Sequence, residues 1–173
     1  MPLFAHAEAE LEIDQNQARL RPTVAGLLVK RDDKGIHIGT HQSVRAMSKG
    51  YVRYTTVGGG INPLEEPTFA MRRELGEEYG EEFARECLIE TLLGSPLSGA
   101  GWSGAKKSYW WFLIIQKGSL MPSLQHSECA DFRWCPLPTI QDGRALTNFS
   151  TNKKHMLWHA LERASRINPE VFK

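Results

Sequence analysis

The segment 58–80, GGGINPLEEPTFAMRRELGEEYG, places a glycine-rich turn directly before a short acidic stretch. Pro67 suits the first turn of a helix, where its missing N–H is tolerated, and Gly80 suits the position just after a helix. We therefore predict a helix over residues 67–79. The preceding run 51–57, YVRYTTV, is rich in β-branched and aromatic residues, which indicates a strand that leads into the glycines.

Three carboxylates share one face of this predicted helix. Glu77 and Glu78 follow Glu74 by three and four residues. The three carboxylates therefore lie within about one helical turn and repel one another. Clustered hard oxygen donors suit Mg²⁺ or Mn²⁺, which also favour phosphate as a further ligand. Taken alone, an E-x-x-E-E run is more often a solvated acidic helix face than a metal site.

A longer pattern makes the metal site the favoured interpretation. From Gly59 the chain reads G-x5-E-x7-R-E-L-x-E-E-x-G, and at ~1 in 20 per fixed position chance is a negligible explanation. The pattern resembles the Nudix box and departs from it only at the last position, 81, where Glu81 replaces a bulky aliphatic residue. The fixed residues of the match are Gly59, Glu65, Arg73, Glu74, Leu75, Glu77, Glu78 and Gly80.

The resemblance implies an α/β fold, the Nudix-type α/β/α sandwich with a mixed sheet. It also implies metal-dependent hydrolysis of a pyrophosphate bond in a nucleoside diphosphate linked to another moiety. That moiety would make the substrate a dinucleoside polyphosphate, a nucleotide sugar or a 5′-triphosphate RNA end. The expected cofactor is Mg²⁺, with Mn²⁺ as the alternative. A catalytically silent nucleotide-binding or interaction module on the same fold is the competing function.

The resemblance also assigns roles to individual residues. The metal ligands would be Glu74, Glu77, Glu78 and the carbonyl of Gly58, with Glu128 added because it precedes Trp134 at the family's spacing. For Glu128 alone, a solvated loop residue is an equal alternative. The catalytic group would comprise Glu74, Glu78 and Arg73. We favour Glu74 as the general base and keep Glu128 as the alternative, while Gly59, Glu65 and Arg73 would brace the loop.

Substrate contacts are less specific in the sequence. Arg53, Lys106 and Lys107 are candidates for binding phosphates, although an ordinary surface cation is the more frequent role. Aromatic residues that suit stacking on a base are Trp102, Trp110, Trp111 and Phe149. Trp110 and Trp111 point to opposite faces of a strand, so at most one of them faces a pocket.

Several short runs resemble bacterial RNA pyrophosphohydrolases and dinucleoside polyphosphate hydrolases. They include GGINPLE, RPTVAG and WFLIIQ. The Thr-Thr-Val before the glycines departs from that subfamily. The net charge of +1 also provides no extended basic track for RNA.

The remaining pattern predicts strands and one further helix around this centre. A continuous apolar run at 23–30 indicates a buried strand, and the turn cluster at 31–35 indicates a hairpin. Met156, Leu157 and neighbouring apolar residues form one stripe of an amphipathic helix over 152–167. Further strands are predicted at 36–40, 87–94, 108–116 and 132–137, and connections at 41–50, 81–86 and 95–107.

The bulk composition sets the remaining expectations. A length of 173 residues with 41% hydrophobic residues suits one domain, residues 21–173, preceded by an N-terminal extension, residues 1–20. The extension is a packing segment, a tail or a dimer-forming arm. No run reaches the ~18 apolar residues of a membrane span, and no signal peptide is recognisable. The 3 cysteines lack metal-ligand spacing, which favours reduced thiols in the cytoplasm.

Overall fold

The computed structural model describes residues 21–92, 97–100, 106–125, 127–149 and 151–173. The expectations for residues 1–20 and for Trp102 therefore lie outside the described residues. Among the described residues, no helix combines the length and the apolar character needed to cross a bilayer.

A mixed sheet forms the centre of the molecule, and β1 (Arg21–Asp32) is its middle strand. It pairs antiparallel with β2 (Gly35–Ser43), which confirms the predicted hairpin, and parallel with β6 (Lys106–Gln116). On the far sides, β7 and β3 pair with β2, whereas β4 and β5 pair with β6. The bounds of these outer strands are β3 (Tyr54–Thr55), β4 (Cys87–Thr91), β5 (Leu97–Ala100) and β7 (Cys129–Pro136).

Both faces of β1 and β6 are buried, which explains why these strands read as continuous apolar runs. Alternate residues enter different cores. Leu27 and Trp111 belong to the core on one face, whereas Leu28 and Phe112 belong to the core on the other. The prediction that Trp110 and Trp111 face opposite sides is confirmed in the same way.

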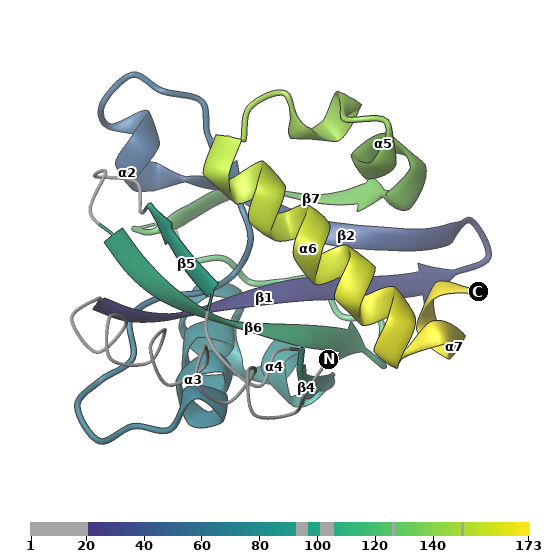
Figure 1. Cartoon of the computed structure of the whole chain (residues 1–173), viewed down its shortest axis with the longest axis horizontal. Coiled ribbons are helices and arrows are strands. Elements are labelled where there is room, and N and C mark those ends of the chain that lie inside the picture. Colours follow the sequence, from purple (N-terminus) through teal and green to yellow (C-terminus); the bar gives the residue numbers. More distant parts are fainter. Residues whose placement is uncertain (1–20, 93–96, 101–105, 126, 150) are drawn as a thin grey trace, which may run out of the picture.

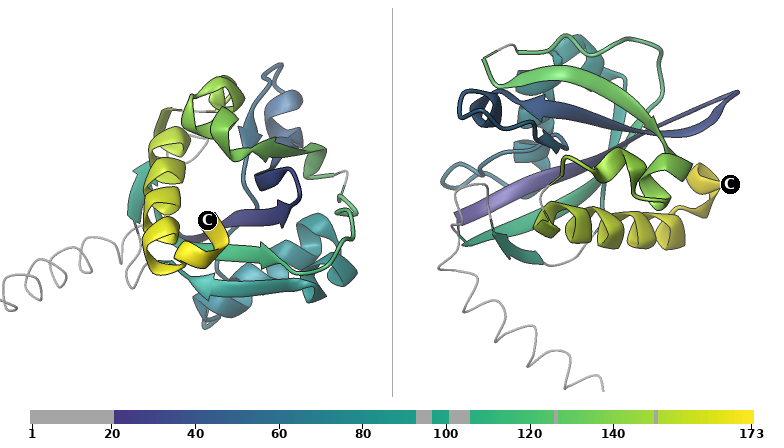
Figure 2. Two further views of the ribbon diagram at one scale, coloured as in Figure 1. Left: turned by 90° about the vertical axis from the view of Figure 1, so that its right-hand side faces the viewer. Right: turned by 90° about the horizontal axis from the view of Figure 1, so that it is seen from above.

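Helices cover the two faces (Figures 1 and 2). α3 (Pro67–Tyr79) and α4 (Glu81–Arg85) pack on one face, and α6 (Thr151–Ile167) packs on the other. Both long helices have almost the predicted bounds, and the apolar stripe of α6 is buried as expected. The predicted α/β/α sandwich is thus confirmed. Shorter helical segments are α2 (Val44–Met47), α5 (Leu137–Gln141), a 3₁₀ turn (Arg144–Leu146) and α7 (Pro169–Phe172).

Several predicted boundaries are wrong, for identifiable reasons. The expected loop 41–50 contains the end of β2 and then α2, because the Ser43 hydroxyl accepts from the Ala46 N–H at the helix start. The expected strand 51–57 is reduced to β3, since the chain leaves β2 there and follows β1. The glycine-rich connection 95–107 includes β5, whose backbone pairs with β6 despite poor strand propensity.

Candidate active site

The glycine turn is hydrogen-bonded to the N-terminal part of β1, which does not pair with β2. The N–H of Val24 donates to the carbonyl of Gly59 at 2.9 Å, and the N–H of Gly26 donates to the carbonyl of Val57 at 2.8 Å. One residue pair further on, the N–H of Ile61 donates to a β1 carbonyl at 3.1 Å. Backbone hydrogen bonds to the central strand therefore help to set the position of the turn.

Two of the turn glycines are required by close approach. Gly58 has φ +149°, and a Cβ there would lie 2.2 Å from the carbonyl oxygen of Val24. A Cβ at Gly59 would lie 2.3 Å from the carboxylate of Glu74. The Val24 backbone cannot give way, and a side chain at position 59 would displace the Glu74 carboxylate, so glycine preserves both the path of the turn and the position of that carboxylate.

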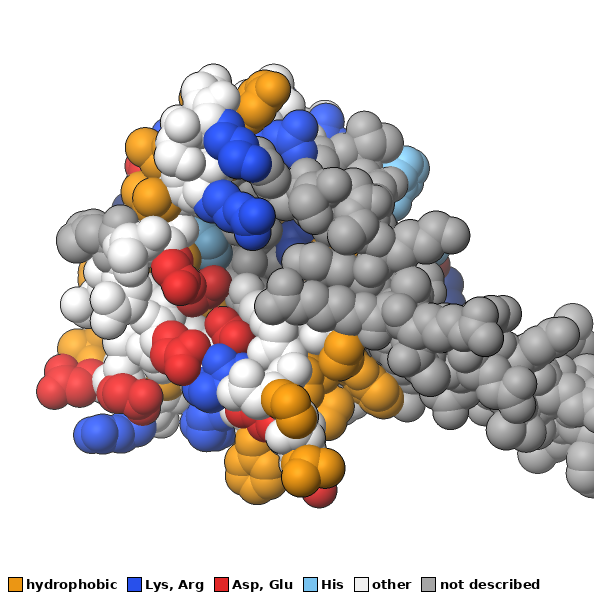
Figure 3. Space-filling view, turned by 90° about the vertical axis from the view of Figure 1, so that its left-hand side faces the viewer, with side chains coloured by type: hydrophobic (Ala, Val, Ile, Leu, Met, Phe, Trp, Pro, Cys, Tyr) orange, Lys and Arg blue, Asp and Glu red, His pale blue; other side chains and the backbone are white. Residues whose placement is uncertain are grey.

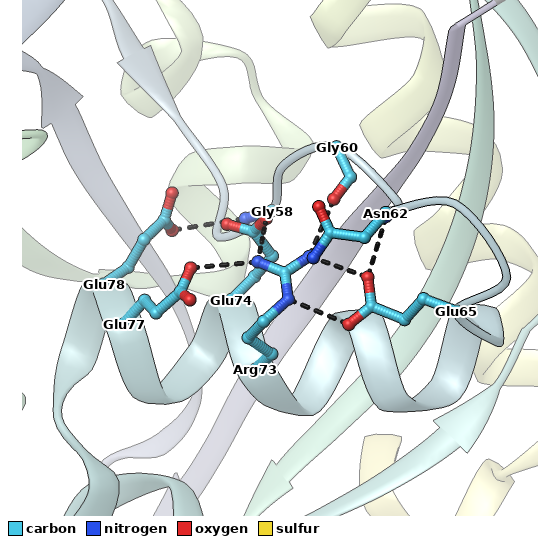
Figure 4. A network of polar contacts seen from close by, with 8 residues as sticks. All are labelled: Gly58, Gly60, Asn62, Glu65, Arg73, Glu74, Glu77 and Glu78. Atoms are coloured by element: carbon cyan, nitrogen blue, oxygen red, sulfur yellow. Dashed lines mark hydrogen bonds and ion pairs between the residues drawn. The ribbon is translucent and has the colours of Figure 1, made fainter.

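Arg73 joins this turn to α3 (Figure 4). Its guanidinium donates to both carboxylate oxygens of Glu65, at 2.8 and 3.0 Å, and to the carbonyl of Gly60 at 2.8 Å. The pairing with Arg73, supported by the N–H of Asn62, lowers the pKa of Glu65 to about 2. The contact between Arg73 and Glu65 expected from the sequence is therefore present.

The same guanidinium reaches the helix carboxylates. Its Nη1 donates to Oε1 of Glu74 at 2.8 Å and to Oε2 of Glu77 at 2.9 Å. Together these contacts raise the pKa of Arg73, and the first contributor is the Glu65 hydrogen bond. One cation thus moderates the repulsion on a helix face that carries several acidic residues.

Glu78 is the most enclosed of these carboxylates, with 6% of its surface exposed. Its Oε2 accepts from the N–H of Gly58 at 3.2 Å. Burial raises the pKa of Glu78 well above its usual range, and the charges of Glu74 and Glu128 raise it further. Burial is also the main cause of the raised pKa of Glu74. The site therefore holds carboxylates whose charge the protein alone does not balance.

Glu128 reaches this cluster because its segment is bound to the end of α3. The last carbonyls of a helix have no partner within the helix. Here the N–H of Ser123 donates to the carbonyl of Tyr79 at 2.9 Å, and the N–H of Gln125 donates to that of Glu78 at 3.1 Å. These bonds place the turn before β7 beside the acidic helix face.

A cleft with a volume of about 700 Å³ opens in front of the glutamates. Its acidic side comprises Glu74, Glu77, Glu78 and Glu128. Figure 3 shows Lys and Arg side chains gathered across a hollow from Asp and Glu side chains. Among the described residues, the cations that line the cleft are Arg45, Arg53 and Lys153. A cleft with walls of opposite sign can bind a metal and a polyanion next to each other.

The residues predicted to bind substrate lie in different places in the structure. Arg53 lines the cleft, as its candidacy requires. Lys106 and Lys107 lie on β6, but their side chains are outside the described part of the structure. Phe149 and Trp111 are wrong as stacking candidates because both are buried in the core around α6. Trp110, the remaining candidate on β6, packs against the opposite core.

Sequence reasoning missed two cations of the cleft. Arg45 lies on α2, in a segment expected to be a loop, and Lys153 lies in the first turn of α6. The Nζ of Lys153 lies 5.5 Å from the ring centre of Tyr109 and 5.3 Å from that of Trp111. A lysine on the N-terminal turn of an amphipathic helix is unremarkable in sequence, so only the fold reveals its position.

Glu81, the one departure from the box, begins α4 instead of packing in the core. Apolar packing at this point comes from Phe83 and Ala84, which are both buried. The Glu81 carboxylate turns back over Gly76, where a Cβ would lie 2.5 Å from its Oε1. An acidic residue also suits the first turn of a helix, so the departure alters the surface of the box and leaves its carboxylates in place.

A family model described as the NUDIX domain matches residues 19–158. The chain belongs to the Nudix family. Membership in this family makes it a hydrolase that acts on pyrophosphate bonds. No curated protein is significantly similar to it in sequence.

Solved Nudix structures share the fold. A C. elegans Ap4A hydrolase binary complex is 18% identical with a TM-score of 0.64, over 87% of this chain and 99% of that one. The E. coli dihydroneopterin triphosphate pyrophosphohydrolase is 14% identical with a TM-score of 0.61, over 80% and 92%. The M. smegmatis Nudix hydrolase RenU is 18% identical with a TM-score of 0.64, over 85% and 87%.

Replacing Arg73 with lysine tests the brace between turn and helix. Lysine keeps the charge but lacks the planar fork that holds Glu65 and Gly60 together. We expect Arg73→Lys to lower the melting temperature by about 3–8 °C and to reduce kcat/KM at least tenfold. Arg72→Lys, an exposed position on the same helix, is the matched control. Equal melting temperatures for the two variants would contradict the brace.

Replacing Glu78 with glutamine tests the electrostatic cost of the site. When the pKa of a carboxyl is higher in the folded than in the unfolded protein, its contribution to stability is fully present below the unfolded pKa. That contribution is lost as the pH rises through the folded pKa. At neutral pH, Glu78→Gln should therefore raise the melting temperature of the metal-free protein by a few degrees. It should also reduce the stabilisation that Mg²⁺ gives the wild type, as thermal unfolding with and without Mg²⁺ will show. A less stable variant would refute this account.

Proposed function

We propose that this Nudix domain uses Mg²⁺ to hydrolyse the pyrophosphate bond of a nucleoside diphosphate linked to another moiety. The observation that carries the proposal is the cleft, in which four glutamates face three cations. Phosphate oxygens suit the basic wall, and a divalent ion suits the acidic wall. Mn²⁺, which takes similar oxygen ligands, is the expected substitute.

The residues present fit a hard divalent cation. Nudix enzymes generally use divalent metals. Burial disfavours the charged forms of Glu74 and Glu78, and their mutual repulsion with Glu128 adds to the cost. A cation held by these groups, by Glu77 and by the carbonyl of Gly58 would remove that cost. When bound, the ion supplies charge neutralisation on the phosphates and activation of a water.

Different side chains of the cleft would accept the proton and bind the phosphates. Among the described residues, Arg73 binds only Oε1 of Glu74, which leaves Oε2 to take a proton from the attacking water. Arg53, together with Arg45 and Lys153, would hold the phosphate oxygens on the opposite wall.

A polyphosphate that joins two nucleosides is the first candidate for the substrate. Three cations that line one cleft suit a chain of several phosphates better than a single diphosphate. The similarity to the C. elegans Ap4A hydrolase, which extends over nearly all of that chain, supports the same choice. Nucleotide sugars and 5′-triphosphate RNA ends are the other candidates. Three cysteines without a disulfide support a cytoplasmic location.

A substrate panel tests the proposed activity. Dinucleoside polyphosphates, nucleotide sugars, nucleoside triphosphates and 5′-triphosphate RNA would be assayed with Mg²⁺ and with Mn²⁺. We expect the highest kcat/KM for a dinucleoside polyphosphate and a loss of at least 10³-fold in Glu78→Gln. Binding of these compounds without product under either metal would instead identify a silent binding module.

Parallel variants of Glu74 and Glu128 identify the general base. Loss of the base lowers kcat and removes the acidic limb of its pH profile, whereas loss of a metal ligand mainly raises the metal concentration required. We expect Glu74→Gln to lower kcat by at least 10²-fold at saturating Mg²⁺. Glu128→Gln should keep the acidic limb and need more Mg²⁺. The opposite assignment follows if the limb disappears only in Glu128→Gln.

A further inference from the structure

Three different metal-binding side chains converge around Glu78. His41 of β2, Glu78 of α3 and Cys129 of β7 each offer one ligand atom, and these atoms all lie within 4.8 Å of one another. The three residues are 2%, 6% and 0% exposed. We propose that this cluster binds a thiophilic divalent cation such as Zn²⁺, and that the bound ion inhibits hydrolysis by occupying Glu78.

The donor set and spacing match the chemistry of zinc. Zn²⁺ accepts nitrogen, sulfur and carboxylate oxygen together, at ~2.0–2.3 Å in a tetrahedral arrangement. Such ligand atoms are ~3.3–3.8 Å apart, so a cluster already within 4.8 Å closes around the ion through small side-chain shifts. Three protein ligands leave the fourth position for water. A hard ion such as Mg²⁺ has no preference for the thiolate.

His41 is already oriented for this role. Its Nδ1 lies 2.7 Å from the hydroxyl of Tyr79, and the two rings meet edge to face at 5.5 Å. When Nδ1 carries the proton and donates to Tyr79, Nε2 is the nitrogen available to a metal. Such a hydrogen bond to the second nitrogen commonly fixes the ring of a metal-binding histidine. Burial lowers the pKa of His41 to about 3, so the ring is neutral at physiological pH.

Cys129 differs from the other two cysteines of the chain. The thiol of Cys87 donates to the carbonyl of Phe83, and that of Cys135 lies 3.5 Å from the hydroxyl of Thr40. Among the described residues, the thiol of Cys129 has no hydrogen-bond partner, although the residue is fully buried. Burial raises the pKa of this thiol, so the metal-free site holds S–H. Zn²⁺ binding forms the Zn–S bond and releases that proton to solvent.

Sharing Glu78 couples this cluster to the hydrolytic site. The proposed function needs the Glu78 carboxylate for Mg²⁺, and one carboxylate held in a zinc site is not available in the same geometry. Inhibition by Zn²⁺ therefore rests on the proposed function, whereas Zn²⁺ binding does not. The two claims are measured separately.

Co²⁺, a spectroscopic substitute for Zn²⁺, tests the binding directly. Titrated into the reduced, metal-free full chain, it should produce a thiolate-to-cobalt charge-transfer absorption that Zn²⁺ abolishes. Cys129→Ser should lack this band, and Cys135→Ser, the matched control on the same strand, should keep it. Circular dichroism confirms folding, and Cys129→Ala is used if the serine variant is unfolded. No band in the wild type, or an unchanged band without Cys129, overturns the proposal.

Two further measurements address affinity and inhibition. In competition with a chromophoric chelator, Cys129→Ala and His41→Gln should each bind Zn²⁺ at least about tenfold more weakly than the wild type. With Mg²⁺ in excess, Zn²⁺ should inhibit the wild type and Cys135→Ser at lower concentration than Cys129→Ala. Equal inhibition of all three overturns the inhibitory role, even where the cobalt band is present. Lack of any hydrolysis refutes the proposed function and leaves the spectroscopic result standing.

Discussion

The guanidinium of Arg73 is the contact on which the site depends. It binds two loop groups, Glu65 and the carbonyl of Gly60, and two helix carboxylates at the same time. It binds Glu74 and Glu77 directly, so without it the repulsion between these carboxylates would be stronger. A lysine at this position has one point charge to offer, whereas the planar fork fixes distances and directions. The spacing between Glu65 and Arg73 in the sequence is therefore a geometric requirement of the turn.

The brace succeeds because its other end is equally fixed. Residues 57–61 follow the edge of β1 through backbone hydrogen bonds, and the turn before β7 is bound to the last carbonyls of α3. These contacts are made by backbone groups rather than by side chains. The carboxylates are thus held by two layers of structure, a backbone framework and one arginine. Glu78 is thereby held in a position where burial opposes its charge.

The sequence predicted those features that are determined by residues close together in the chain. The bounds of α3 follow from Pro67 and Gly80, and the register of the box follows from fixed residues within one short segment. α4 was not predicted because it is short and mostly charged, and only two of its residues, Phe83 and Ala84, are buried. Lys153 was missed because its place in the cleft depends on the packing of α6 across the sheet. The spacing of residues along the chain does not indicate how close Lys153 lies to the glutamates of the cleft.

The two walls of the cleft also explain why metal and substrate should bind together. Burial raises the pKa of Glu78, the charges of Glu74 and Glu128 raise it further, and Lys153 offsets only part of this effect. A polyphosphate alone would meet the glutamates, and a metal ion alone would leave Arg45 and Arg53 without phosphate oxygens. Each ligand removes the repulsion that opposes the other, and such coupling is reciprocal. The cleft is therefore complementary to a metal–polyphosphate pair rather than to either component.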